Sequence, residues 1–369
     1  MLKVAVFFGG VSCEHDVSVI TGMLAVNLLR GAEMDVLPVY LGREGGMFTS
    51  PEMTGVAAFR SPSRFTPVVF GDGAICSAKG RKKPLFIPDV ALNCCHGGMG
   101  EGGTLAALFD WYRIPSASPE MPVSAVFMNK KFSALAARGA ELPVARSFAA
   151  REEEDRQEMF RRAKELGYPV IVKPCRLGSS IGISVAANEE KLEKALSAAF
   201  CYDGEALVEE YFADKRDINC AAYRIGGEIR TSLCEEAFSS GDILSFEEKY
   251  GGGNTRNAKI PADIPEAVAE DIRAMTARLY DAFDCSGIVR ADFIYAGGKA
   301  YFNELNTVPG SLACYLFGES LSDAKKLLAS LVREAAERKR EKKITPGTHL
   351  LDSDIFVGAK SCKDRKNLV

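Results

Sequence analysis

The sequence predicts an α/β protein with more than one packed domain, and three observations carry that prediction. Near the N-terminus a compact apolar run ends at a Gly-Gly turn and gives way to apolar residues at helical spacing. In the middle a charged helical stretch leads into the apolar run YPVIVKP. Towards the C-terminus two β-rich runs flank a short glycine break. Strands and helices therefore alternate along a chain whose 369 residues are enough for two or three domains.

The N-terminal region predicts a strand, a tight turn and a helix. Residues 2–8 form the strand and residues 9–10 the turn. The apolar residues at helical spacing that follow are Val17, Ile20, Leu24 and Leu28. Residues 34–41 and 90–95 predict further strands, so a parallel sheet is expected here.

Two loops of this region are candidate ligand-binding loops, because ligands of such sheets gather at the carboxyl ends of the strands. Glu14, His15 and Ser18 follow the first strand, and His96 and Glu101 lie in the glycine-rich loop HGGMGEGG. For His96 the alternative is a structural loop histidine. The Gly-Gly turn could also belong to a dinucleotide site, but the GxGxxG spacing of that motif is missing.

A second unit follows the predicted linker, residues 115–119, and begins with a helix over residues 121–138. A charged helix over residues 152–166 leads into YPVIVKP, and the loop CRLGSSIG separates that strand from ISVAA. Backbone N–H groups in such a loop can bind phosphates, and Lys173 at the end of the strand supplies a matching positive charge. An ordinary β-turn is the alternative interpretation of the loop.

A helix over residues 190–200 and the strand ALVEEYF complete this unit, and residues 218–234 are mostly strand-like. The long polar connection after them contains Lys249, Tyr250 and three successive glycines. Long connections are typically lids or disordered segments, and we expect a lid that closes over the site and excludes water. The last predicted helices span residues 265–283 and 322–342.

Residues 287–310 predict a β-hairpin that carries a metal site. Two β-rich runs flank a predicted three-residue loop, residues 296–298, and side chains alternate between the faces of a strand. Four polar residues then share one face: Arg290, Asp292, Glu304 and Asn306. Two carboxylates and an amide carbonyl suit a hard cation such as Mg²⁺, and the arginine can stabilise developing negative charge. An exposed face with solvated charges is the alternative.

The composition excludes several classes of function. Net charge is −3, whereas proteins that bind nucleic acid or membrane surfaces need a basic face. No apolar run approaches the roughly 20 residues of a membrane helix, and MLKVAVFF is not followed by a cleavage site, so we expect a cytoplasmic protein. The 11 cysteines form no CxxC pairs, which argues against a disulfide framework and a zinc site.

Five blocks taken together resemble the D-alanine–D-alanine ligases of the ATP-grasp superfamily. They are FFGGVSCEHDVS, HGGMGEGGTL, KPCRLGSSIG, EEKY with the following IPA, and VRADF with NELNTVPG. The resemblance covers about residues 3–337. It implies a three-domain ATP-grasp architecture with an N-terminal parallel-sheet substrate domain (1–118), a central subdomain (119–213), a C-terminal catalytic domain (214–343) and a polar tail (344–369).

The resemblance also implies a reaction. ATP would phosphorylate the carboxylate of one D-alanine, and the amine of a second would attack the acyl phosphate to give D-alanyl-D-alanine for peptidoglycan synthesis. Its cofactors would be ATP and two Mg²⁺ (or Mn²⁺) ions, and its partners small molecules rather than nucleic acid or membrane. A cytoplasmic homodimer is expected.

The resemblance further assigns roles to single residues. ATP would contact Lys130, Lys173, Ser179, Glu209, Tyr211, Phe212, Asp217 and Lys249. Metal ions would bind Asp292, Glu304 and Asn306. Catalysis would use Glu14, Ser179, Tyr250, Arg290 and the Gly310 backbone, with Glu14 holding the first ammonium group. The amino acid substrates would contact Glu14, His96, Ser311, Tyr315 and Leu316.

Two departures from the family pattern concern the substrates. The usual GEDG reads GEGG here, so Gly102 replaces an acidic residue. The Ser-Leu pair expected to bind the second carboxylate is displaced: a deletion puts Ser311-Leu312 there, and an ungapped match puts Tyr315-Leu316 there.

Three rival functions remain at this point. A ligase that joins D-alanine to another amino acid such as D-serine belongs to the same superfamily, and Tyr250 favours an amine over a hydroxy acid as acceptor. A degenerate ATP-binding homologue would have lost Asp292, Glu304 and Asn306, which are all present. A dinucleotide oxidoreductase lacks its fingerprint.

Overall fold

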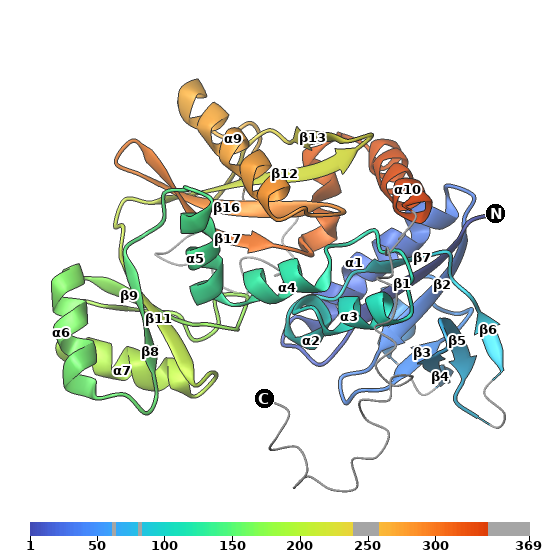
Figure 1. Cartoon of the computed structure of the whole chain (residues 1–369), viewed down its shortest axis with the longest axis horizontal. Helices are drawn as coiled ribbons and strands as arrows, with labels where there is room; N and C mark the ends of the chain where they lie inside the picture. Colours follow the sequence, from blue (N-terminus) through green and yellow to red (C-terminus); the bar gives the residue numbers. More distant parts are fainter. Residues whose placement is uncertain (61–63, 80–82, 239–257, 339–369) are drawn as a thin grey trace, which may run out of the picture. The chain divides into compact units, whose positions relative to one another are not determined.

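Three β-sheets follow one another along the chain (Figure 1). A computed structural model describes residues 1–60, 64–79, 83–238 and 258–338. The predicted polar tail lies outside these residues. In the described part, no helix is both long and apolar enough to cross a membrane.

The first sheet has the strand order β6-β5-β4-β3-β2-β1-β7. Its strands are β1 (Lys3–Gly9), β2 (Asp35–Leu41), β3 (Met47–Thr49), β4 (Thr66–Gly71), β5 (Ala74–Ser77), β6 (Pro84–Phe86) and β7 (Val90–Asn93). Strand β1 pairs in parallel with β2 and β7, which confirms the predicted parallel core. Strands β3 to β6 extend that core as an antiparallel meander, so the sheet is mixed rather than parallel throughout. The meander was not predicted because its strands are short and irregularly patterned.

Helix α1 (His15–Arg30) packs closely on the first sheet at Gly22. A Cβ atom at Gly22 would lie 2.2 Å from Cγ of Phe8, so only glycine allows this approach. Val17 is buried, as its helical spacing predicts, but Ile20 is 55% exposed and lines the cavity described below. The remaining short helices of this region are η1 (Val56–Arg60), α2 (Gly98–Glu101) and α3 (Thr104–Trp111).

The single helix predicted over residues 121–138 is two helices, α4 (Met121–Met128) and α5 (Lys130–Gly139). Asn129 between them has extended backbone angles, and its side chain accepts hydrogen bonds from the backbone N–H groups of Lys131 and Phe132. Such an N-cap starts a new helix, so the helical spacing on either side hides the break. The break places Lys130 at the start of α5, beside the cavity.

The second sheet is antiparallel, with the order β10-β9-β11-β8. Its strands are β8 (Ser147–Arg151), β9 (Val170–Pro174), β10 (Ser184–Ala186) and β11 (Glu205–Glu210). Helices α6 (Arg156–Leu166) and α7 (Glu189–Phe200) bury their apolar faces against it. Helix α6 begins later than predicted, because Asp155 caps it.

The third sheet has six strands in the described residues, in the order β15-β14-β12-β16-β17 with β13 paired to β12. They are β12 (Arg216–Ile225), β13 (Glu228–Thr231), β14 (Glu235–Ala237), β15 (Ala258–Lys259), β16 (Val289–Ala296) and β17 (Lys299–Asn306). Helix α9 (Glu266–Ala282) packs on this sheet. The last elements are η3 (Gly310–Leu316) and α10 (Leu321–Glu337).

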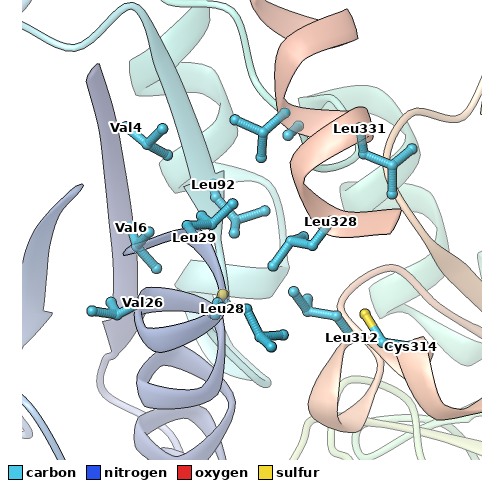
Figure 2. Close-up of a cluster of buried hydrophobic side chains, with 14 of the residues drawn as sticks. Val4, Val6, Val26, Leu28, Leu29, Leu92, Leu312, Cys314, Leu328 and Leu331 are labelled. Carbon is cyan, nitrogen blue, oxygen red and sulfur yellow. The ribbon is translucent and has the colours of Figure 1, made fainter. Parts of the chain in front are cut away.

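The largest core joins the first and last described elements of the chain. Figure 2 shows Leu28 and Leu29 of α1 with Leu312 of η3 and Leu328 of α10. Each of these side chains is at most 7% exposed. Burial of apolar side chains of this size contributes about 1.5–3 kcal/mol each. The N-terminal sheet and the segment after the hairpin are therefore held together by one apolar interface. The domain boundaries expected from the family resemblance stay a prediction.

We predict that Gly22→Ala destabilises the protein, because the new methyl group must displace the Phe8 ring. Overpacking of this kind costs about 1–3 kcal/mol. The matched control is Gly139→Ala at the end of α5, where a Cβ atom meets nothing within 4 Å. That change should alter stability by less than about 1 kcal/mol. Urea unfolding measures both, and an unchanged midpoint for Gly22→Ala would contradict the close packing.

Candidate active site

A cavity of about 520 Å³ is lined by residues from the regions of all three sheets. Most of the predicted site residues line it: Glu14, His96, Lys130, Lys173, Ser179, Glu209, Tyr211, Phe212, Asp217, Arg290, Asp292, Glu304, Asn306, Gly310, Ser311 and Tyr315. Leu316 does not, because its side chain packs in the core with Leu312. Lys249 and Tyr250 lie outside the described residues, as does the predicted lid around them.

The hairpin of β16 and β17 puts its two carboxylates on one side, but not in the predicted way. The turn has two residues, Gly297 and Gly298, because Ala296 pairs with Lys299. A two-residue turn alone would pair Asp292 with Asn303 and turn Glu304 to the other face. Instead the register shifts by one residue at Asn303, so that Asp292 pairs with Glu304. This β-bulge restores the parity that a three-residue loop would have given, and it aims both Asn303 and Glu304 into the cavity.

Arg290 and Asp292 form a partly buried ion pair on β16. Nε of Arg290 lies 2.6 Å from Oδ1 of Asp292, and Nη2 lies 2.7 Å from Oδ2. Burial alone would lower the pKa of Arg290, but the charge of Asp292 and these hydrogen bonds raise the pKa well above its usual value. The guanidinium therefore stays charged inside the cavity. Nδ2 of Asn306 donates to the same carboxylate at 2.9 Å.

Glu14 is held between two glycine backbones and a serine. A Cβ atom at Gly97 would lie 2.7 Å from Oε2 of Glu14, and one at Gly178 would lie 2.6 Å from it. Ser179 donates a hydrogen bond to Oε1 of the same carboxylate. Ser179 adopts a left-handed φ of 55°. This conformation lies in the loop CRLGSSIG and places that loop next to Glu14. The glycines of both loops are needed because any side chain there would collide with Glu14.

The two lysines at the central unit are oriented by protein acceptors. Nζ of Lys173 lies 2.5 Å from Oε2 of Glu209 and donates to Oδ1 of Asn303 at 2.9 Å. Nζ of Lys130 donates to the backbone oxygen of Leu177 at 2.5 Å. Both amines lie at the wall of one cavity, so they can act together on an anionic group.

Aromatic and charged residues form another part of the cavity wall. The ring of Phe212 stacks on Tyr301 with a centroid distance of 4.8 Å. Asp217 forms an ion pair with Lys215. An aromatic surface beside a carboxylate is suited to a nucleoside, because the ring can contact a flat base and the carboxylate can accept from sugar hydroxyls.

His96 is buried and Glu101 is partly buried, and both have displaced pKa values. Burial, and then the charge of Arg290, lower the pKa of His96 to about 4, and its Nε2 lies 2.9 Å from Oγ1 of Thr21. Burial, and then the nearby Glu14, raise the pKa of Glu101 to about 7. Glu101 accepts backbone hydrogen bonds from Gly97 at 2.7 Å and from Val308 at 3.2 Å. His96 is therefore neutral near pH 7, whereas Glu101 titrates there.

The glycine that replaces the acidic residue of GEDG has a local structural reason. A Cβ atom at Gly102 would lie 2.8 Å from the backbone oxygen of Gly98. The backbone of α2 would have to shift before any side chain fitted there. Glu101 keeps its own backbone hydrogen bonds in this arrangement.

Ser311 and Tyr315, the alternative contacts for a second carboxylate, both reach the cavity. The backbone N–H of Ser311 donates to Oγ1 of Thr21 at 3.2 Å. The hydroxyl of Tyr315 donates to Oε2 of Glu235 at 2.9 Å. A tyrosine has one hydroxyl proton, and here that proton is directed at a protein carboxylate.

Thr21, Asn219, Glu235 and Asn303 are among the polar cavity residues that were not predicted. Asn303 could have been noticed, because Asn303 and Glu304 are adjacent polar residues that interrupt the alternation of a strand. The other three carry no sequence signal of their own. Thr21 lies on a mostly apolar helix, and Glu235 is one of two adjacent glutamates.

The donor set of the cavity fits a divalent metal ion. Eight carboxylates but only four lysine and arginine side chains belong to the described lining residues. Asp292 and Glu304 face each other across adjacent strands, with the amide of Asn306 beside them. Such oxygen ligands suit Mg²⁺ or Mn²⁺. A polyphosphate could enter this negative cavity only together with cations.

Two protein-family profiles match the chain. The profile described as "D-ala D-ala ligase N-terminus" matches residues 3–119, and "D-ala D-ala ligase C-terminus" matches residues 137–334. The chain is 32% identical over 354 residues to a D-alanine–D-alanine ligase of Thermosipho melanesiensis, covering 93% of this chain and 96% of that protein. It is 33% identical over 333 residues to one of Wolinella succinogenes, covering 89% and 92%.

Solved structures agree with these relatives. A D-alanine–D-alanine ligase from Helicobacter pylori superposes with a TM-score of 0.73 at 26% identity, covering 90% of this chain and 98% of that one. The VanG D-Ala:D-Ser ligase from Enterococcus faecalis gives a TM-score of 0.78 at 26% identity, covering 90% and 99%.

Glu101 predicts a pH dependence of stability in the metal-free protein. Its pKa is about 7 in the folded state against an ordinary value of 4.5, so between these values the folded state binds more protons than the unfolded chain. Stability should therefore fall as pH rises through this window, by roughly 3 kcal/mol at 1.36 kcal/mol per pKa unit.

The test compares the wild type with Glu101→Gln by urea unfolding at pH 5 and pH 8. The variant should gain stability relative to the wild type by about 2–3 kcal/mol between these pH values. His96 has the opposite effect at acid pH, but both proteins contain it, so it cancels in the difference. A difference that does not change with pH would show an ordinary pKa for Glu101.

Proposed function

The chain belongs to the D-alanine–D-alanine ligase family, and we propose that its cavity joins two molecules of D-alanine at the expense of ATP. The product, D-alanyl-D-alanine, would serve as a peptidoglycan precursor. One observation carries the proposal: Glu14, Ser179, Arg290 and Asp292 come from distant parts of the chain and line a single cavity. We also infer a cytoplasmic homodimer.

The first D-alanine would bind with its ammonium group at Glu14. This carboxylate is 9% exposed and is oriented by the hydrogen bond from Ser179. A buried carboxylate favours a cationic partner, and the backbones of Gly97 and Gly178 lie close against it. Neutral His96, on the same cavity, would add a polar contact without repelling the ammonium group.

ATP and a divalent metal follow from the family, and we infer two Mg²⁺ (or Mn²⁺) ions. Asp292, Glu304 and Asn306 would hold them, because they are adjacent oxygen donors on one face of the hairpin. When bound, the metal neutralises phosphate charge and orients the transferred phosphoryl group.

Residues of the central unit would bind the nucleotide itself. Lys130 and Lys173 supply positive charge for the phosphates, and the loop at Ser179 covers them. The adenine and ribose would be surrounded by Glu209, Tyr211, Phe212 and Asp217. Of these, Phe212 stacks on Tyr301. Lys249 is proposed for ATP, and Tyr250 for a hydrogen-bonded triad with Glu14 and Ser179, from the family pattern alone.

Arg290 and the backbone N–H of Gly310 would stabilise the tetrahedral intermediate. The second amine attacks the acyl carbon, the carbonyl oxygen gains negative charge, and phosphate then leaves. A guanidinium that remains charged within a cavity is a preorganised partner for that oxygen. The pairing of Arg290 with Asp292 fixes its direction before the substrate arrives.

Phosphate release from ATP in the presence of D- and L-amino acids tests this function. We expect release with D-alanine and not with L-alanine, together with D-alanyl-D-alanine detected by mass spectrometry. Absence of D-alanine-dependent release with Mg²⁺ and Mn²⁺ would support a degenerate homologue instead.

Asp292→Asn and Glu304→Gln should both abolish turnover, because each removes a carboxylate proposed for the metal. Their effects on the metal-free protein should differ. Asp292→Asn weakens the partly buried ion pair with Arg290, so it should also lower the free energy of unfolding by about 1–3 kcal/mol. A loss of stability would distinguish Asp292 from a carboxylate that only repels its neighbours, because neutralising such a carboxylate would raise the free energy of unfolding.

The measurements are phosphate release over a range of Mg²⁺ concentrations and urea unfolding in the presence of a chelator. Activity like that of the wild type at limiting Mg²⁺, in either variant, would count against the metal assignment.

Ser311→Ala should raise the Michaelis constant for the second D-alanine and leave that for ATP nearly unchanged. The loss of one hydrogen bond to a carboxylate costs about 1.5–3 kcal/mol, which is roughly ten- to a hundredfold. Tyr315→Phe is the matched variant, since it also removes one hydroxyl. We expect it to have the smaller effect on D-alanine, because the Tyr315 proton is directed at Glu235. The reverse order would support the ungapped alignment.

A further inference from the structure

The loop between β9 and β10 (residues 175–183) carries Ser179, and its own backbone hydrogen bonds are long. Within it, the N–H of Ile181 donates to the backbone oxygen of Gly178 at 3.3 Å, and a second such turn follows at 3.4 Å. Good N–H···O hydrogen bonds are shorter than this. A loop loses conformational entropy when it takes a single conformation, so contacts with other segments must hold it in place.

One carboxylate outside the loop accepts hydrogen bonds from Arg176, near the start of the loop. It belongs to Asp203, whose side chain is 6% exposed, in the turn between α7 and β11 (residues 201–204). Oδ2 of Asp203 accepts from the backbone N–H of Arg176 at 2.8 Å, and Oδ1 accepts from Nη2 at 2.6 Å. Nε of Arg176 lies 3.2 Å from both oxygens. The backbone and the side chain of Arg176 are therefore bound to one carboxylate, and the two residues form a clamp.

The turn between α7 and β11 also supports the rest of the loop. Oδ1 of Asp203 accepts from the backbone N–H of Glu205 at 3.1 Å, and the N–H of Cys175 donates to the backbone oxygen of Glu205 at 3.0 Å. Towards the end of the loop, Gly182 has a φ of 73°, and a Cβ atom there would lie 2.9 Å from Cδ2 of Tyr202. Both ends of the loop therefore contact the same turn and the strand that follows it.

Between its two ends the loop reaches the cavity. The backbone oxygen of Leu177 accepts from Nζ of Lys130 at 2.5 Å, and the hydroxyl of Ser179 donates to Glu14. Leu177 and Ser179 line the cavity, whereas the two residues of the clamp do not. The clamp can therefore act on the cavity only through the loop that it holds.

We propose that Arg176 and Asp203 are positioning residues that hold this loop in the conformation that binds ATP and orients Glu14. The inference rests on the proposed ligase function and adds to it two residues outside the cavity. When the clamp is broken, a smaller fraction of the protein has the loop in the competent conformation. The apparent affinity for ATP falls with that fraction, whereas saturating ATP restores it and keeps the turnover number.

Asp203→Asn breaks the clamp with little change in volume. Each oxygen of Asp203 accepts from an N–H group, so the NH₂ group of the new amide faces a donor in either orientation. We expect the Michaelis constant for ATP to rise about tenfold and kcat to stay within about threefold of the wild type. Phosphate release with saturating D-alanine measures both. A mere loss of folded protein would give the opposite pattern, a lower kcat with an unchanged Michaelis constant.

Arg176→Lys is the second variant, because the Arg176 side chain is 55% exposed and its replacement leaves the packing of the fold intact. Lysine keeps the charge and the backbone hydrogen bond but cannot make the bidentate contact, so the Michaelis constant for ATP should rise less than in Asp203→Asn. Glu158→Gln is the matched control. Glu158 binds Arg161 within α6 through two hydrogen bonds of 2.7 Å, and neither kinetic constant should change.

Hydrogen exchange followed by mass spectrometry gives a readout that does not depend on activity. In the ligand-free protein, Asp203→Asn should speed exchange in residues 175–183 about tenfold, because the loop leaves its conformation more often. Residues 147–151 of β8 should exchange as in the wild type. Glu158→Gln should leave both segments unchanged.

Three results would overturn the inference. A folded Asp203→Asn protein with an unchanged Michaelis constant for ATP would remove the positioning role and leave the proposed function intact. A lower kcat at an unchanged Michaelis constant would do the same, and would show that Asp203 serves only the fold. No D-alanine-dependent phosphate release from the wild type would remove the proposed function, and the positioning role with it, whatever the exchange rates.

Discussion

The apolar contact of α1 with η3 and α10 is the interaction on which the cavity depends (Figure 2). It joins the first helix of the chain to the last one described, across about 300 residues of sequence. On the cavity side of the same contact, Thr21 of α1 lies within hydrogen-bond distance of His96 and accepts from the backbone of Ser311. The residues of the hydrophobic interface and of the polar contacts therefore belong to the same helix, α1. A substitution that loosens the core would displace the Glu14 loop from the Arg290 strand, even without touching either residue.

Electrostatic balance is the second constraint. The cavity gathers more carboxylates than cations in its described lining, and the structure manages the excess by different means. Asp292 is paired with Arg290, Glu209 with Lys173, and Glu101 holds its proton up to about pH 7. Like charges that cannot all be paired raise each other's pKa values, and a metal ion relieves the same repulsion. A site of this kind is most stable when its cations are bound, which couples ligand binding to the stability of the fold.

The sequence was sufficient for most of this architecture, because the decisive signals are local. Apolar runs and helical spacing located β1, α1, β9, α7 and α9. Five short motifs carried the family resemblance and the candidate site residues. What it could not supply depends on contacts between distant segments. The bulge at Asn303 is one case. The predicted loop was one residue too long and the bulge was not predicted, and these two errors cancelled, so the predicted parity of the hairpin was right. The break at Asn129 is another, since a polar residue inside a helical pattern can be either an exposed position or a cap.

The walls of the cavity differ in how freely they can change. Around Glu14 the walls are backbone, because Gly97 and Gly178 leave no room for a Cβ atom. A substitution there moves the loops themselves, so the position of the Glu14 carboxylate is tied to the fold. Other parts of the wall are side chains: Glu235 on β14 and Tyr315 on η3 line the cavity and can change while their backbones stay in place. Substitutions of such side chains can therefore alter the shape and polarity of the cavity without altering the fold.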